Sequence, residues 1–443
     1  MFLRGEVIYL KRFFSLVLAL ILLVSLGGCN NASIDDYSST EVEVIIEQDE
    51  VISMENQEVE SNVSSLPTED VTSQPTASNN SSEEQTISET EETSSKVTSS
   101  EITTVQESKH NLNDMKTLKK VKLNGRCEKT DYGVLLNMSC SAIEFNTDSS
   151  SVLLEINADL GVYYSVMVDG KITQEHKVIE VAGTDYIAAA RGLSAGTHNV
   201  KIIRESESRS GREFCVVNIQ LDEGANLLER DANKKMIEFL GDSLTSGYGN
   251  LGTSATPGAS DLKFQSATKA YPFLVASKLN LDYRIVSMSG IALAKRDGYP
   301  TFPEFYGLEN YHADKSKKYF SSNPQDVDIV VVNLGTNDAS DKLYNEKDFE
   351  SVKSYGKRYA NLITDIGYRK DVKIVFVSGV CWCHTQTPAY NEAINELKSR
   401  GYNDAYTIDI RSLQSGGGGH PSAEEHIEAA DTLIKFFKEN KIV

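Results

Sequence analysis

The sequence IEFLGDSLTSGYGN, residues 237–250, joins an apolar run to a serine that is followed closely by further glycines. A short apolar run that ends in glycine is typical of a buried β-strand followed by a turn. Ser243 is therefore expected at a strand end, where its hydroxyl can face solvent. The triplet Gly-Asp-Ser alone predicts only a turn. Ser243 becomes a candidate nucleophile when other segments supply the groups that a nucleophile needs.

Three further segments supply those groups, and each lies beside a strand-like run. In chain order they are Ser289-Gly290, Gly335-Thr336-Asn337-Asp338 and His420-Pro421. Histidine is the usual base for a serine hydroxyl because its pKa lies near neutrality. Acyl transfer also needs donors for the developing oxyanion. We therefore predict a catalytic pair of Ser243 and His420, with an oxyanion hole formed by the N–H groups of Ser243 and Gly290 and the side-chain amide of Asn337.

Each of these segments also has a structural explanation when it is taken alone. Gly290 and the residues around Asn337 are good turn formers, and a single histidine is most often a surface residue or a satisfied core residue. His420 differs in its setting, because it follows a glycine run and precedes Pro421-Ser422. Ser422 can cap a helix that begins at the next residue. The four segments together favour the catalytic interpretation.

Residues 231–443 show the alternation of strands and helices that is typical of an α/β domain. Apolar strand-like runs lie at 236–240, 283–287, 329–333, 374–378 and 405–410, and helices are predicted at 270–279, 349–366, 388–399 and 423–439. Near-continuous apolar strands favour a parallel sheet covered by helices on both faces. Ligands bind at the carboxyl ends of the strands in such sheets. We predict a three-layer α/β/α domain with its site at that edge.

Residues 116–230 have a different pattern, without helical periodicity. Short alternating runs lie at 134–138, 152–156, 163–168, 177–181, 186–189, 199–203 and 214–221. Turn residues such as Asp169-Gly170 separate them. Many short strands of this kind predict an antiparallel β-sandwich, of the jelly-roll type.

Residues 1–29 resemble the signal peptide of a bacterial lipoprotein. Basic residues precede an apolar run that is short for a membrane span, and the run ends in Leu26-Gly27-Gly28-Cys29. Small residues before a cysteine are typical of a lipobox, in which Cys29 is lipidated and becomes the first mature residue. A diacylglycerol supplies the two chains that stable anchoring needs. We expect anchoring to the extracellular face of the cell membrane; the alternative is an ordinary signal peptide with an incidental cysteine.

Residues 30–115 are predicted to be a disordered linker rich in Ser, Thr and Glu. Almost no aromatic residue occurs there, so the segment cannot bury enough apolar surface to offset the entropy of ordering. Residues 30–110 contain 19 acidic residues and two lysines, and so hold most of the formal net charge of −20. This charge says little about what the folded part binds, and an acidic balance gives no support to nucleic-acid binding.

The cysteines are sparse for a fold held by disulfides. They are Cys29, Cys127, Cys140, Cys215, Cys381 and Cys383. A bridge between Cys127 and Cys140 is compatible with export, but spacing does not establish it. Cys381-Trp382-Cys383 has no second cysteine pair at zinc-ligand spacing, and His384 is the one further ligand nearby. We expect neither a metal nor a cofactor.

The four catalytic segments resemble those of the SGNH, or GDSL-like, hydrolases over residues 233–443. Ser243, Gly290, Asn337 and His420 match that family's four residues. The strings IEFLGDSLTSGYGN, NLGTND and HPSAEEH, preceded by a sandwich that includes Gly125-Arg126, resemble carbohydrate esterase family 2. That family consists of acetyl esterases of plant cell-wall polysaccharides with an N-terminal jelly roll. The resemblance implies a serine esterase that removes O-acetyl groups from acetylxylan or acetylglucomannan.

One departure from the family pattern concerns the group that orients His420. Many family members carry an aspartate two or three residues before the histidine, where this chain has Gly418 and Gly417. Loss of the orienting carboxylate of a triad can cost about 10⁴-fold in rate. A backbone carbonyl of the run 416–419 can accept the Nδ1 proton instead, and some esterases of the family work with a Ser-His dyad. Glu424 and Glu425 are weaker candidates, and a decayed enzyme is the remaining alternative.

Aromatic residues near the expected site favour a sugar substrate. Trp382 follows the 374–378 strand and is a candidate for stacking on a sugar ring, although core packing explains it equally well. Further aromatic surface is offered by Tyr248, Tyr299, Phe302, Phe305 and Tyr306. We expect the partner to be an acetylated polysaccharide or oligosaccharide. The alternatives are a non-catalytic glycan-binding lipoprotein and an acetyl esterase of another glycan, such as peptidoglycan.

Overall fold

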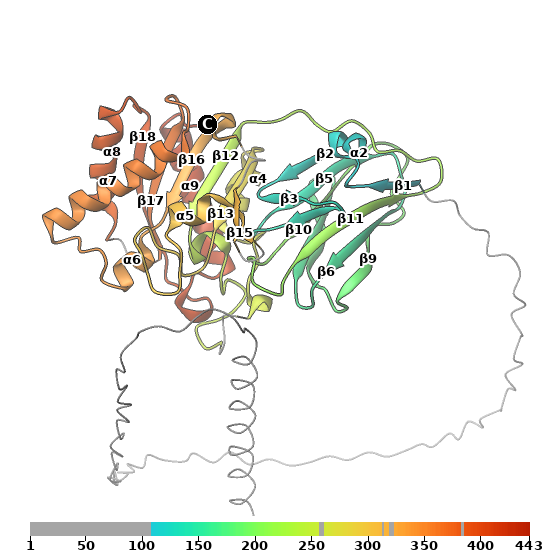
Figure 1. Ribbon diagram of the computed structural model, residues 1–443, viewed down its shortest axis with the longest axis horizontal. Coiled ribbons are helices and arrows are strands. Elements are labelled where there is room, and N and C mark those ends of the chain that lie inside the picture. The colour runs from blue at the N-terminus through green and yellow to red at the C-terminus, as the bar shows by residue number, and fades with distance from the viewer. Residues whose placement is uncertain (1–107, 257–260, 312–313, 319–322, 382–384) are drawn as a thin grey trace, which may run out of the picture. The chain divides into compact units, whose positions relative to one another are not determined.

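The computed structural model describes residues 108–256, 261–311, 314–318, 323–381 and 385–443, which all belong to one compact unit. These residues form two antiparallel sheets, drawn in cyan and green in Figure 1, and then a parallel sheet with helices. The signal peptide, Cys29, nearly all of the predicted linker, and Trp382, Cys383 and His384 lie outside the described residues.

The N-terminal region is an antiparallel β-sandwich, as predicted. One sheet has the strand order β3-β4-β11-β6-β9, with β1 also paired to β11, and the other has the order β2-β5-β10-β7-β8. The strands are β1 (Ser108–Asn111), β2 (Val121–Asn124), β3 (Cys127–Lys129), β4 (Val134–Leu136), β5 (Ala142–Thr147), β6 (Val152–Ala158), β7 (Tyr163–Val168), β8 (Lys171–Val178), β9 (Gly183–Ala190), β10 (His198–Arg204) and β11 (Phe214–Leu221). The jelly-roll connectivity stays a prediction.

The structure corrects two expectations about this region. The sandwich begins at β1, inside the range 30–115 that was assigned to the linker, because the polar strand Ser108–Asn111 carries no apolar alternation and is held by its ladder with β11. A helix α2 (Met115–Lys120) follows it. The strand predicted at 177–181 is instead β8, which begins at Lys171. This edge strand is largely exposed, so burial leaves no pattern in its sequence.

The C-terminal region contains a five-stranded sheet in which every pair is parallel. Its order is β13-β12-β16-β17-β18, and the strands are β12 (Met236–Gly241), β13 (Asp282–Ser287), β16 (Val327–Asn333), β17 (Lys373–Cys381) and β18 (Ala405–Arg411). Gly241, the last residue of β12, stands opposite Ser287 and Asn333. The loops that follow these three strands therefore leave the sheet at one edge, as the sequence predicts.

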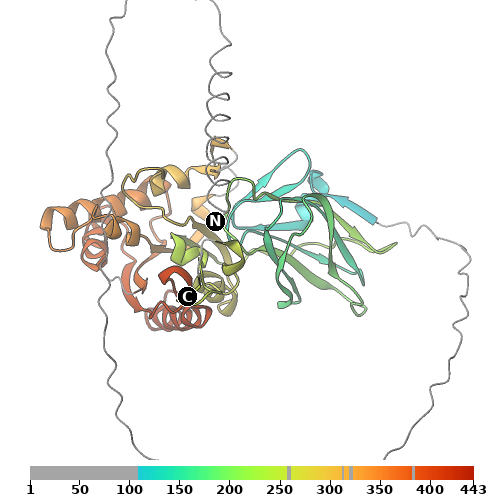
Figure 2. The same cartoon turned by 90° about the horizontal axis from the view of Figure 1, so that it is seen from below.

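Helices cover both faces of this sheet and complete the predicted three layers. Helices α7 (Phe349–Ile366) and α8 (Thr387–Ser399) pack in one apolar cluster, and α4 (Tyr271–Lys278) and α9 (Ala423–Glu439) pack in another. Figure 2 shows α9, drawn in red, on the other side of the sheet from the orange α7. Strand β12 contributes to both clusters, because Leu240 packs in the α7/α8 cluster and Phe239 packs in the α4/α9 cluster. This alternation follows from the two-residue repeat of a strand.

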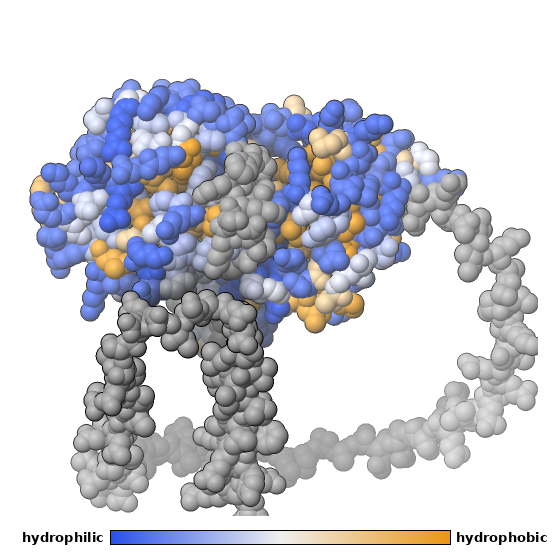
Figure 3. Space-filling view, in the orientation of Figure 1, coloured by the Kyte–Doolittle hydropathy of each residue, from blue (hydrophilic) through white to orange (hydrophobic). Residues whose placement is uncertain are grey.

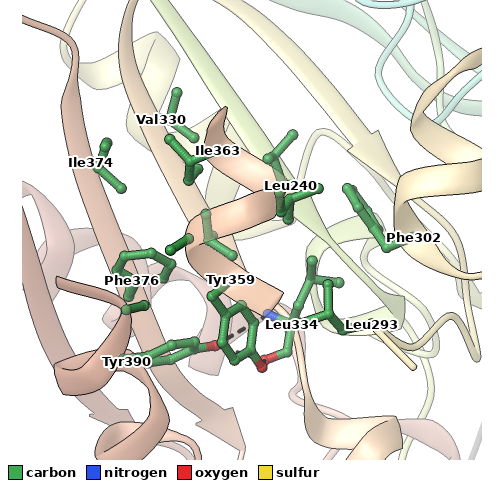
Figure 4. Packing of buried hydrophobic residues seen from close by; sticks show 14 of the residues in the cluster. Leu240, Leu293, Phe302, Val330, Leu334, Tyr359, Ile363, Ile374, Phe376 and Tyr390 are labelled. Carbon is green, nitrogen blue, oxygen red and sulfur yellow. Dashed lines mark hydrogen bonds between the residues drawn. The ribbon is translucent and has the colours of Figure 1, made fainter. Parts of the chain in front are cut away.

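The α7/α8 cluster also fixes the start of the segment that carries Asn337. Tyr359 and Tyr390 both donate hydrogen bonds from their hydroxyl groups to the carbonyl of Leu334, at 3.0 and 2.6 Å (Figure 4). Leu334 directly follows β16 and is buried in the same cluster. The turn after β16 is therefore held by two buried side chains from two different helices.

The surface seen in Figure 3 is mainly hydrophilic, with apolar side chains in scattered groups. Such scattered exposure is usual for a globular domain. Within the part of the chain that the structure describes, no helix combines the length and the apolar composition that a membrane span requires.

Candidate active site

Ser243 is the first residue of a one-turn helix, α3 (Ser243–Ser246), directly after β12. Asp242 caps this helix, and its Oδ1 accepts the N–H of Leu244 at 3.0 Å. Gly247, with φ of 79°, ends the helix in the left-handed conformation. The short helix therefore places Ser243 at the sheet edge, and its N–H has no acceptor within the helix.

His420 lies in the loop between β18 and α9, and its ring reaches Ser243. Its Nε2 is 2.9 Å from the Oγ of Ser243, and its Nδ1 is 3.0 Å from the carbonyl oxygen of Gly418. If Nδ1 donates to this carbonyl, Nε2 is the unprotonated nitrogen that can accept the serine proton. The acceptor at Nδ1 is thus a backbone carbonyl of the glycine run, at the position where other triads have a carboxylate.

The glutamates of α9 do not take that role. Glu425 is buried and forms a capping box with Ser422, and its carboxylate accepts the N–H groups of Ser422 at 2.7 Å and Ser415 at 3.0 Å. Glu424 is exposed. Glu425 therefore holds both ends of the loop that carries His420, and the ring itself is oriented by Gly418.

The histidine loop packs directly on the segment that follows the nucleophile. The N–H of Gly417 donates to the carbonyl of Gly249 at 2.8 Å. A Cβ at Gly249 would lie 2.3 Å from the carbonyl oxygen of Gly417, and Gly249 has φ of 69°. Both the close backbone approach and the left-handed conformation require glycine here. The glycines of the GYGN sequence thus set the distance between Ser243 and His420.

The predicted oxyanion donors meet around Ser243 in an open cavity of about 730 Å³. Gly290 lies there with φ of 81°, and no described residue accepts a hydrogen bond from its N–H. Asn337, in α6 (Thr336–Ser340), lies against both segments, because its Nδ2 is 2.9 Å from the carbonyl of Ile291 and 3.3 Å from Oδ2 of Asp242. Asn337 thus ties the Gly290 turn to the nucleophile turn, besides lining the cavity.

Burial shapes the electrostatics of this site. Burial lowers the pKa of His420 below its ordinary value, against raising effects from the Gly418 carbonyl and from Glu207. Burial also raises the pKa of Asp242 to about 7, with a further rise from Asp338. A lowered histidine pKa keeps the imidazole neutral, which is the form that acts as a base.

Asp338 organises the segment that follows Gly290. Its carboxylate accepts the N–H of Leu293 at 3.0 Å and of Ala294 at 2.8 Å, and the hydroxyl of Tyr355 donates to it at 3.0 Å. The aspartate of the Gly-Thr-Asn-Asp segment therefore fixes the backbone at Leu293 and Ala294 from a buried position. The sequence singled out this segment for its asparagine, and only the fold shows what Asp338 contacts.

The aromatic residues divide between the cavity and the core. Tyr248 and Tyr299 line the cavity, and the ring of Tyr248 lies 4.6 Å from that of His420. Phe302 and Phe305 are buried in the α7/α8 cluster. Tyr306 packs under the guanidinium of Arg126 and so faces the sandwich. The expectation of aromatic substrate surface therefore fails for these three residues, and Trp382 lies outside the described residues.

The sandwich also contributes to the cavity, which was not predicted from the sequence. Glu207 and Arg209, between β10 and β11, line the same cavity as Ser243 and His420. Their segment, ESESRSGRE at 205–213, is strongly polar and is typical of a solvent-exposed loop. No sequence signal shows that Glu205 and Glu207 are buried.

Cys127, Cys140 and Cys215 are free and buried, and Cys381 is also buried. The bridge between Cys127 and Cys140 that the sequence left open therefore does not form. Among the described residues, no cluster of three histidine, cysteine or acidic side chains has the arrangement of a metal site.

Two family models match the two regions of the chain. The carbohydrate esterase 2 N-terminal model matches residues 123–230, and the GDSL-like lipase/acylhydrolase family model matches residues 239–426. The chain belongs to carbohydrate esterase family 2. It is thereby a carboxylic ester hydrolase by family.

Two curated relatives are similar to this chain over about two thirds or more of its length. The cellulase/esterase CelE of Acetivibrio thermocellus is 26% identical over 333 residues, which are 72% of this chain and 39% of that protein. The acetylxylan esterase / glucomannan deacetylase of Cellvibrio japonicus is 25% identical over 316 residues, which are 68% of this chain and 85% of that protein. This chain thus spans well under half of the first relative.

Solved structures show the same fold. A family two carbohydrate esterase from Clostridium thermocellum, in complex with cellohexaose, has a TM-score of 0.61 at 23% identity and covers 72% of this chain and 98% of that one. An acetyl xylan esterase from the rumen bacterium Butyrivibrio proteoclasticus has a TM-score of 0.66 at 17% identity and covers 75% of this chain and 98% of that one. The sandwich and the α/β domain therefore occur together in this family.

Proposed function

We propose that this esterase removes O-acetyl groups from plant cell-wall polysaccharide, acetylxylan or acetylglucomannan, through a Ser-His dyad. The observation that carries the proposal is the contact of Ser243 Oγ with His420 Nε2 at 2.9 Å, with Nδ1 of the same ring on the Gly418 carbonyl. Two consecutive hydrogen bonds thus join the nucleophile, the base and the acceptor that orients the base. The family relatives that act on acetylated xylan and glucomannan support the choice of substrate.

In the first half of the reaction, Ser243 Oγ attacks the acetyl carbonyl carbon and His420 Nε2 takes the serine proton. The carbonyl oxygen becomes an oxyanion that the N–H groups of Ser243 and Gly290 stabilise. The Asn337 amide joins them when one of its two hydrogens leaves its present acceptor, Asp242 or Ile291. Collapse of this intermediate breaks the ester bond. His420 returns the proton to the leaving sugar oxygen, and an acetyl group remains on Ser243.

In the second half, water attacks the acetyl-enzyme and His420 takes a proton from it. The same donors stabilise the second oxyanion, and collapse releases acetate while Ser243 regains its proton. The Gly418 carbonyl keeps the ring in one tautomer through both halves. It accepts the Nδ1–H but carries no full charge to stabilise the imidazolium, so the site depends more strongly on its oxyanion donors.

The cavity suits a sugar ester more than a long acyl chain. Its walls combine Tyr248 and Tyr299 with polar and charged side chains such as Glu207 and Arg209. Tyrosines offer flat faces to sugar rings, and the charged groups can bind hydroxyl groups. We include Trp382 among the substrate-binding residues on the strength of its place after β17.

The proposal is tested by acetate release from acetylated xylan, glucomannan and peptidoglycan, together with hydrolysis of 4-nitrophenyl acetate. We expect acetate from the plant polymers and no turnover by Ser243→Ala or His420→Ala. A fully active Ser243→Ala variant would sink the proposal. Release from peptidoglycan alone would change the substrate, and glycan binding without release would favour a non-catalytic role.

We also propose that Cys29 carries a lipid that anchors the enzyme to the outer face of the cell membrane. The support is the sequence Leu26-Gly27-Gly28-Cys29 after a short apolar run. Cells fed a clickable fatty acid should label the wild-type protein in the membrane fraction. Cys29→Ala should carry no label, and equal labelling of both proteins would contradict the anchor.

A further inference from the structure

The loop between β10 and β11 of the sandwich is built to reach the active site. Arg204, at the end of β10, is fully buried and donates to the carbonyls of Ser206 at 2.8 Å, Glu207 at 3.1 Å and Arg212 at 2.7 Å. A buried guanidinium with several carbonyl partners fixes the backbone around it. The loop is thus held from within the sandwich, although its composition is that of a mobile loop.

This loop delivers the carboxylate of Glu207 to the turn that carries Gly290. Glu207 is only 3% exposed, and its Oε2 accepts the N–H of Ser289 at 2.9 Å. Its other oxygen pairs with the guanidinium of Arg209 at 2.9 Å. A buried carboxylate that accepts a backbone N–H makes a strong, directional contact.

A cation holds the other side of the same turn. Arg296 donates through Nη1 to the carbonyl of Gly290, and its Nε bonds to Asp341 at 2.5 Å. The ring of Tyr299 lies under its guanidinium at 4.9 Å. The oxyanion donor is the N–H of Gly290. The peptide group before it is bound by the Glu207 carboxylate through the Ser289 N–H, and the peptide group after it is bound by the Arg296 guanidinium through the Gly290 carbonyl.

We propose that Glu207 is a positioning residue of the esterase, through which the β-sandwich holds the Gly290 oxyanion donor in place. The inference rests on the proposed function, because it gives Gly290 its role there. The sandwich is then a part of the catalytic apparatus and not only a neighbouring domain. Misplacement of a catalytic group by about 1 Å can cost on the order of 100-fold in rate.

The charge of Glu207 also acts on His420. It raises the pKa of His420, in opposition to the lowering by burial. Tyr248 lies against the ring of His420, His426 in α9 interacts with it electrostatically, and Arg209 lines the same cavity. Removal of the Glu207 charge should therefore move the titration of His420 to lower pH, an effect that a merely structural residue would not have.

The test compares Glu207→Ala, Glu207→Gln and Glu175→Gln in the full protein. Glu175 is the matched control, because it also joins the sandwich to the α/β domain, through Lys269 at 3.1 Å, but does not line the cavity. With 4-nitrophenyl acetate we expect kcat of Glu207→Ala to fall about 100-fold while KM changes little. Glu207→Gln, which keeps an oxygen acceptor, should recover part of that loss and shift the NMR titration midpoint of His420 to lower pH. Glu175→Gln should match the wild type.

A second readout separates this inference from the proposed function. A fluorophosphonate probe reacts with an activated serine, so that the serine oxygen bonds to phosphorus and fluoride leaves, whatever ester the enzyme prefers. Slower labelling of the Glu207 variants at an unchanged unfolding midpoint supports the inference. Equal labelling and equal kcat overturn it, as does a loss of activity that only follows a loss of folded protein. A wild type inert to both reagents contradicts the proposed function and this inference with it.

Discussion

His420 depends for its orientation on a neutral acceptor, the carbonyl of Gly418. A carboxylate at that position would hold the ring and also favour the protonated imidazolium. A carbonyl also holds the ring, but it stabilises the imidazolium less than a carboxylate does. Burial also disfavours the imidazolium. His420 is therefore a weaker base, and its imidazole stays neutral at lower pH.

The first prediction concerns this titration. The pKa of His420 is lowered, so the imidazole stays neutral as the pH falls below 6.5, and base catalysis is lost only when the pH passes the lower folded value. NMR of the histidine Cε1–H groups, with His420→Ala to assign the signal, should show a midpoint below 6.5. A direct titration is preferable to a rate profile, because Asp242 has a pKa of about 7 and titrates in the same site. A His420 midpoint above the ordinary value would contradict this reading of the site.

The second prediction concerns Asn337. Its amide lines the cavity and also bonds to the Ile291 carbonyl, so Asn337→Ala removes a donor and loosens the Gly290 turn. We expect kcat on 4-nitrophenyl acetate to fall about 100- to 1000-fold. Ser340→Ala is the matched control, since Ser340 lines the same cavity from the same helix but bonds only to the Thr336 carbonyl. Retention of more than a tenth of the wild-type kcat would argue against an oxyanion role.

At the residue scale, the sequence singled out the candidate groups that the fold brings together and missed the residues that hold them in place. Ser243, Gly290, Asn337 and His420 stand in short segments with strand ends and glycines beside them, so local sequence marks them. Glu207 and Asp338 act through burial and through contacts far along the chain. Their effect depends on Arg204 and Tyr355, which nothing in the local sequence connects to them.

At the scale of elements, the site is formed by loops that leave one edge of the sheet. The loop with Ser243 and the loop with His420 contact each other through backbone atoms. The contact between Gly249 and Gly417 is the closest of these approaches among the catalytic segments described above. No side chain mediates it. The distance between nucleophile and base is therefore set by two main chains.

The third prediction tests this contact with Gly249→Ala. The added methyl group would lie 2.3 Å from the Gly417 oxygen, so the histidine loop must move. We expect kcat to fall at least about 10-fold, because the Ser243–His420 hydrogen bond lengthens. Gly401→Ala is the control, since Gly401 has φ of 87° but open space around its Cα. It should lose about 1 kcal/mol of stability and keep its activity. Equal kinetics for both variants would show that the close approach is not needed.

The elements themselves were unequally predictable. The five parallel strands and helices α4, α7, α8 and α9 appear as predicted to within a few residues, because buried strands and amphipathic helices leave strong patterns. In the sandwich, β3 has only three residues, and β8 is an exposed edge strand. Such strands are defined by their partners, so their own sequence shows little.

At the scale of the whole molecule, the sandwich and the α/β domain share buried polar contacts. Glu205 of the sandwich is fully buried and accepts the hydroxyl of Ser266 at 2.9 Å and the N–H of Thr268 at 3.0 Å. Lys122 and Asp282 form a buried ion pair at 2.6 Å. Separation of the two regions would leave these charges without partners, which is costly. The two regions therefore form one folding unit.

The fourth prediction concerns where that unit begins. A protein shortened to start at residue 107 should keep the stability and kcat of the longer chain, because every described residue remains. One that starts at residue 116 lacks β1 and the fully buried Leu112. We expect its free energy of unfolding in urea to fall by at least about 2 kcal/mol. Equal midpoints for the two proteins would show that β1 does not belong to the fold.

The buried cysteines also decide how this protein responds to oxidants. Burial raises the pKa of Cys127 and Cys215 to about 12, so almost no reactive thiolate exists at neutral pH in the folded state. Among the described residues, no cysteine sulfur is exposed to an oxidant. Alkylating reagents should reach these cysteines only when the chain unfolds. The rate of thiol labelling therefore reports the rate of unfolding.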